Sequence, residues 1–71
     1  MSDSTEIEQL EQRAAELHRL FQRADQMAAF HERHEHNDAP TFRRRADAWF
    51  ADYEAAVRDL RRAREAEARQ S

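Results

Sequence analysis

The residues best able to do chemistry are three histidines and a glutamate near the middle of the chain. Residues 31–36 read HERHEH. Imidazole and carboxylate groups are good ligands for zinc, nickel or copper. On a helix, His31 lies on the same face as His34 and Glu35, because residues three and four apart are neighbours. The candidate metal ligands are therefore His31, His34, Glu35 and His36.

The spacings of well-known metal motifs are missing from this segment. The residue three positions after Glu32 is Glu35, so the His-Glu-x-x-His pattern of zinc proteases is absent. A Glu-x-x-His pair repeated on two helices, as in di-iron bundles, is absent too. Clustered histidines also occur on solvated helix surfaces near a turn. A metal-binding or metal-sensing bundle is therefore an alternative hypothesis, and we predict no cofactor.

A run of three arginines follows the histidines, at Arg43, Arg44 and Arg45. Positive charge near the start of a helix is unfavourable, so something should offset it. The simpler interpretation is local pairing with the acids at the end of the preceding helix, Glu32, Glu35 and Asp38. The other is a phosphate or an acidic partner. Phe30 either extends the core near the tip or stands partly exposed as an aromatic anchor for a partner. The candidate partner-binding residues are therefore Phe30 and these three arginines.

No catalytic constellation is visible. The chain has no cysteine nucleophile, and it has no glycine to form a phosphate-binding loop or a nucleophile elbow. Its few serine and threonine hydroxyl groups lie near the ends of the sequence or at the turn. We expect the protein not to be an enzyme.

The elements that must position these residues follow from the apolar spacing. From Ile7 to His31, and again from Phe42 to Ala63, apolar or core-compatible residues return in alternating steps of three and four. Such steps place side chains on one stripe of an α-helix. The sequence therefore predicts an all-α fold of two amphipathic helices, over about residues 4–36 and about 40–69.

One turn signal separates the helices, at about residues 37–40, where Asn37 and Asp38 precede Pro40. Proline fits the first turn of a helix because its missing N–H has no partner there. A connection this short makes the helices antiparallel neighbours. We expect Phe21 to lie level with Ala56 or Val57, and a buried Trp49 level with Ala28.

The whole chain of 71 residues is predicted to be a single helical-hairpin domain. Leu20 and Met27 widen the apolar stripe of the first helix, and Phe50 and Val57 widen that of the second. These stripes are wider than one helix–helix seam needs. A domain of this size also rarely buries enough surface alone. We therefore expect the hairpin to dimerise into a four-helix bundle around a two-fold axis.

Charge and composition narrow the class of partner. The net charge is −3, and 38% of the residues are charged. Residues 1–38 carry nine acids and four arginines, and residues 39–71 carry six acids and eight arginines. An acidic balance argues against general nucleic-acid binding, although a bundle using the arginines for that purpose stays a weaker alternative. No apolar run has signal-peptide or membrane-spanning length, so we expect a cytoplasmic location and no membrane partner. The favoured hypothesis is a homodimeric adaptor, chaperone or regulator that binds a larger protein.

Overall fold

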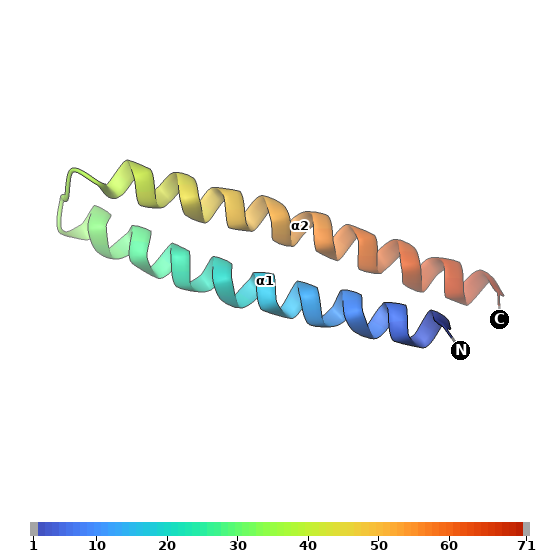
Figure 1. The fold of residues 1–71 in the computed structure, drawn as a ribbon. Helices are drawn as coiled ribbons and strands as arrows, with labels where there is room; N and C mark the ends of the chain where they lie inside the picture. The colour runs from blue at the N-terminus through green and yellow to red at the C-terminus, as the bar shows by residue number, and fades with distance from the viewer. Residues whose placement is uncertain (1, 71) are drawn as a thin grey trace.

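The chain folds into an antiparallel hairpin of two long helices (Figure 1). The computed structural model describes residues 2–70, and the side chains of residues 5–70. Helix α1 spans Ser2–Arg33 and helix α2 spans Ala39–Gln70, with 32 residues each. The Cα atoms extend over 53 × 14 × 13 Å. The predicted all-α hairpin is confirmed, and neither helix of residues 2–70 has the length and apolarity needed to cross a membrane.

Helix α1 ends at Arg33, three residues before the end that the sequence pattern predicts. Glu35 adopts a left-handed conformation, with φ of 57°. The His36 N–H donates to the His31 carbonyl (2.9 Å), and the Glu35 N–H donates to the Glu32 carbonyl (3.2 Å). These two bonds form a Schellman motif, which satisfies the last carbonyls of a helix and usually has glycine at the left-handed position. A glutamate holds that position here because the chain has no glycine.

Helix α2 begins at Ala39, close to the predicted start. The Asp38 carbonyl accepts the first bonds of the helix, from the N–H groups of Thr41 (3.0 Å) and Phe42 (3.1 Å). Pro40 therefore stands in the first turn, where its missing N–H costs no hydrogen bond.

Small side chains make most of the seam between the helices. The residues that the two helices bury are five alanines and two leucines: Ala14, Leu17, Ala28, Ala39, Ala46, Ala56 and Leu60. Ala28 and Ala46 are 0% exposed, one on each helix near the tip. Alanine at these positions lets the helix backbones approach closely. Among residues 5–70, no large side chain is fully buried.

The register differs from the predicted one by about six residues of α2, or nearly two helical turns. The ring of Phe21 contacts Phe50, with centroids 5.0 Å apart, so Phe21 is not level with Ala56. The ring of His18 contacts Tyr53 at 5.2 Å in the same way. The early end of α1, three residues before the predicted end, contributes to this shift because it moves every residue of α2 relative to its expected neighbour.

Trp49 is only partly buried in the hairpin, and its predicted burial within a four-helix bundle stays a prediction. It packs against a core cluster of Ala14, Leu17 and Ala56, which lies further from the tip than Ala28 does. The other side of the indole stays open to solvent. A large apolar side chain is thus left half covered at the centre of the hairpin.

Candidate functional site

The hairpin tip, which we define as residues 30–45, gathers the predicted site residues. His31 and His36 meet across the end of helix α1, with their Nδ1 atoms 2.8 Å apart. One ring donates and the other accepts in this hydrogen bond. The His31 ring also stacks on Phe42 of helix α2, at a centroid distance of 4.0 Å and an interplanar angle of 6°. His31 therefore links the two helices at the tip.

The four candidate metal ligands do not come together as a set. His31 and His36 turn their Nδ1 atoms toward each other. His34 lies against the Phe30 ring at 4.5 Å, and Glu35 is exposed in the turn. Within residues 2–70, no three histidine, aspartate or glutamate side chains are arranged to hold a metal ion. What the sequence predicts as a ligand cluster is here a cluster of stacked and hydrogen-bonded rings.

Phe30 forms an exposed aromatic centre for this cluster. Its side chain is 49% exposed. Its ring nevertheless contacts His31 at 5.5 Å, His34 at 4.5 Å and His36 at 6.0 Å. Of the two roles that the sequence leaves open, an extension of the core or an exposed anchor, the exposure favours the second. The histidines hold the ring in place without covering it.

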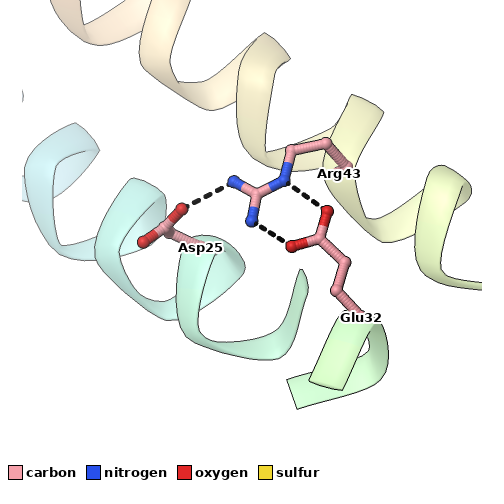
Figure 2. A network of polar contacts seen from close by, with 3 residues as sticks. All are labelled: Asp25, Glu32 and Arg43. Carbon is pink, nitrogen blue, oxygen red and sulfur yellow. Dashed lines mark hydrogen bonds and ion pairs between the residues drawn. The ribbon is translucent and has the colours of Figure 1, made fainter. Parts of the chain in front are cut away.

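Arg43 is the best-connected charged residue of the tip. Its Nε and Nη2 donate to the two carboxylate oxygens of Glu32, at 3.0 and 2.7 Å (Figure 2). Its Nη1 donates to Oδ1 of Asp25 at 2.7 Å. These hydrogen bonds hold the pKa of Glu32 below its ordinary value of 4.5, and they raise the pKa of the Arg43 guanidinium. The unfavourable positive charge of Arg43 at the start of α2 is therefore compensated by two carboxylates of the same chain.

The sequence predicts the pairing with Glu32 but not the one with Asp25. The signal available was spacing, because Asp25 and Glu32 are seven residues apart and so lie on one face of α1. The expected register placed Asp25 too far from Arg43. The other acids proposed as neighbours, Glu35 and Asp38, make no ion pair with the described residues.

Arg44 and Arg45 differ from Arg43, since neither forms an ion pair within residues 2–70. The Arg45 guanidinium lies over the Phe42 ring, 5.8 Å from its centroid. Arg44 is exposed. Two of the three arginines are therefore available to a partner, and the third is used by the fold.

A shallow apolar groove runs from the tip toward the middle of one face of the hairpin. It has a volume of about 220 Å³, and Arg23 and Arg45 stand at its edges. Met27, on its wall, is 45% exposed. We call this hollow the tip groove. Its apolar lining comes from both helices: Leu20, Ala24, Met27, Phe42 and Trp49.

The chain matches no family model, and no curated protein or solved structure is significantly similar to it.

Proposed function

We propose that this protein is a homodimeric helical-hairpin module that binds a larger protein through its tip. The observation that carries the proposal is the thin core. The hairpin buries alanines and two leucines, while Met27, Phe30 and Phe50 stay 45%, 49% and 40% exposed. Contiguous exposed apolar surface marks interaction sites, and Met27 belongs to the apolar lining of the tip groove. A second copy is the simplest cover for the stripes along the helices.

Phe30 lies at the tip rather than on a helix seam, and so suits a different partner. A rigid aromatic side chain with charged neighbours is a common anchor in protein interfaces. Arg44, which forms no ion pair within residues 2–70, supplies a positive charge on the same end of the molecule. A protein surface with an apolar pocket and an acidic rim would fit this pair. We also propose a cytoplasmic location for the module.

The two alternative functions have less support. A metal site would start from a set without a third converging ligand, because no group of three histidine, aspartate or glutamate side chains within residues 2–70 is arranged to hold an ion. A nucleic-acid surface would need free positive charge, but Arg43 is held by two carboxylates. The net charge of −3 adds repulsion from phosphate.

Affinity capture from the source cell tests the tip. Wild-type protein and Phe30→Ala are used as baits, and the captured proteins are compared by mass spectrometry. We expect Phe30→Ala to lose a specific partner while it keeps its helicity and its assembly state. Phe50→Ala is the matched control, because Phe50 is a comparably exposed aromatic residue away from the tip. Capture of the same proteins by both variants and by wild type would contradict the role of the tip.

A further inference from the structure

We infer that the tip groove is covered by a second copy of the chain, with the two hairpins pointing in opposite directions. In this arrangement Arg45 meets Asp52 of the partner subunit, and Arg23 meets Glu16 of the partner subunit. The inference rests on the proposed homodimer and specifies its geometry. It follows from the placement of charge along the face that carries the groove.

Charges of opposite sign stand on that face at matching intervals. Arg45 and Asp52 are seven residues apart on α2, and Glu16 and Arg23 are seven residues apart on α1. Seven residues are about two helical turns, so both members of each pair lie on one side of their helix. Arg23 and Arg45 edge the tip groove, and Asp52 lines the next hollow along the face, toward the helix ends.

The midpoints of the two intervals coincide with the apolar residues at the end of the groove away from the tip. Halfway between Glu16 and Arg23 is the level of Leu20, and halfway between Arg45 and Asp52 is the level of Trp49. Leu20 and Trp49 line the same groove. A two-fold axis crossing the helices at this level therefore lays each arginine on an acid of the other copy. One axis satisfies both helices.

The same axis covers the open side of Trp49. Each copy then places Leu20 and Trp49 at the centre of the interface, and the charged pairs surround them. An apolar centre with a charged rim is the usual layout of a specific interface. The opposite arrangement, with both tips at one end, gathers Arg23 and Arg45 of both copies together. Like charges then repel, and this disfavours parallel stacking.

Charge reversal tests the geometry without removing apolar area. Arg45→Asp and Asp52→Arg are made in separate chains, and each is studied alone and in an equal mixture by sedimentation and native mass spectrometry. We expect each variant alone to self-associate about tenfold more weakly than wild type, because each homodimer has two like-charge contacts. In the mixture both contacts pair opposite charges, so heterodimers should predominate.

Two further chains make the test decisive. The double variant Arg45→Asp with Asp52→Arg should recover self-association, and Arg23→Glu mixed with Glu16→Arg should behave like the first pair. Arg44→Asp, one residue from Arg45 but outside the groove, is the matched control and should dimerise as wild type does.

The outcomes separate this inference from the proposed function. If the wild type dimerises but each single variant associates normally, the proposed geometry is wrong although the dimer exists. The same conclusion follows if the mixtures give no excess of heterodimer. A dimer that is weakened by Phe50→Glu but not by Met27→Glu would also overturn it, because the opposite face would then be the interface. A wild-type monomer at micromolar concentration would overturn the dimer itself.

Discussion

Arg43 makes the two ion pairs that join the helices near the tip. A guanidinium group can bind one carboxylate with two parallel hydrogen bonds, and Arg43 binds Glu32 in this way. Its remaining nitrogen reaches Asp25, on the same helix face. The pair between Arg43 and Glu32 also ties the start of α2 to the last turn of α1. Charges that would be unfavourable at either helix end are favourable together.

The first prediction concerns the thermal stability of the protein at acid pH. The pKa of Glu32 is lowered in the folded protein, so its ion pair stabilises the fold above the ordinary pKa of 4.5. That stability is lost as the pH falls through the lowered pKa. We expect Glu32→Gln to melt below wild type at pH 7, and the gap to close at acid pH. Thermal melts followed by circular dichroism measure it. Glu35→Gln, which removes a carboxylate without an ion pair among the described residues, should show a much smaller gap.

Glu35 itself gives the second prediction. A residue with a Cβ atom is strained in the left-handed conformation that the end of α1 requires. Glu35→Gly should therefore raise the free energy of unfolding by about 1 kcal/mol, after allowance for the greater freedom of glycine in the unfolded chain. Urea denaturation is the measurement, and Glu35→Ala is the control that should bring no such gain. Equal stability of the glycine and alanine variants would contradict the Schellman assignment.

At the scale of the helices, periodicity was enough to predict the fold. The steps of three and four from Ile7 to Ala63 fixed two helices and one turn, since only one break interrupts them. The end of α1 could not be predicted, because its usual signal is a glycine and Glu35 takes that place. The wrongly predicted end of α1 contributes to a wrong predicted register between the two helices. With the wrong register, the sequence does not predict the pairing of Asp25 with Arg43. It does predict the pairing of Arg43 with Glu32.

Close helix contact near the tip gives the third prediction. Ala46 is 0% exposed, so a larger side chain there must push the helices apart. Ala46→Leu should lower the free energy of unfolding by about 1–3 kcal/mol, as overpacking usually does. Ala48→Leu, two residues further on the exposed side of α2, is the matched control and should be nearly neutral. Similar denaturation midpoints for the two variants would show that the seam is not tight at Ala46.

The whole molecule is a rod whose apolar residues are divided between a narrow seam and open faces. A hairpin of two helices can enclose small side chains, but Trp49 and Phe50 are too large for the space between them. The sequence predicts apolar stripes that are wider than one helix–helix seam needs. The partial exposure of Trp49 in the single chain agrees with that prediction. Which face a second copy covers could not be predicted from periodicity alone, because it depends on the register that places Leu20 beside Trp49.

Trp49 gives the fourth prediction, since it is the one tryptophan of the chain and reports on its groove without interference. If a second copy covers the groove, its fluorescence emission should move to shorter wavelength as the protein concentration rises through the dissociation constant. Quenching by acrylamide should weaken over the same range. Met27→Glu, which places a charge on the groove wall, should hold the emission at the long-wavelength limit at every concentration.

In the proposed homodimer, two hairpins share one apolar core. Sedimentation equilibrium at micromolar concentration is the most direct measurement of this assembly. We expect a mass twice that of the 8.5 kDa chain, together with a melting midpoint that rises with protein concentration because folding and association are coupled. A fully helical species of 8.5 kDa, with a midpoint independent of concentration, would contradict it.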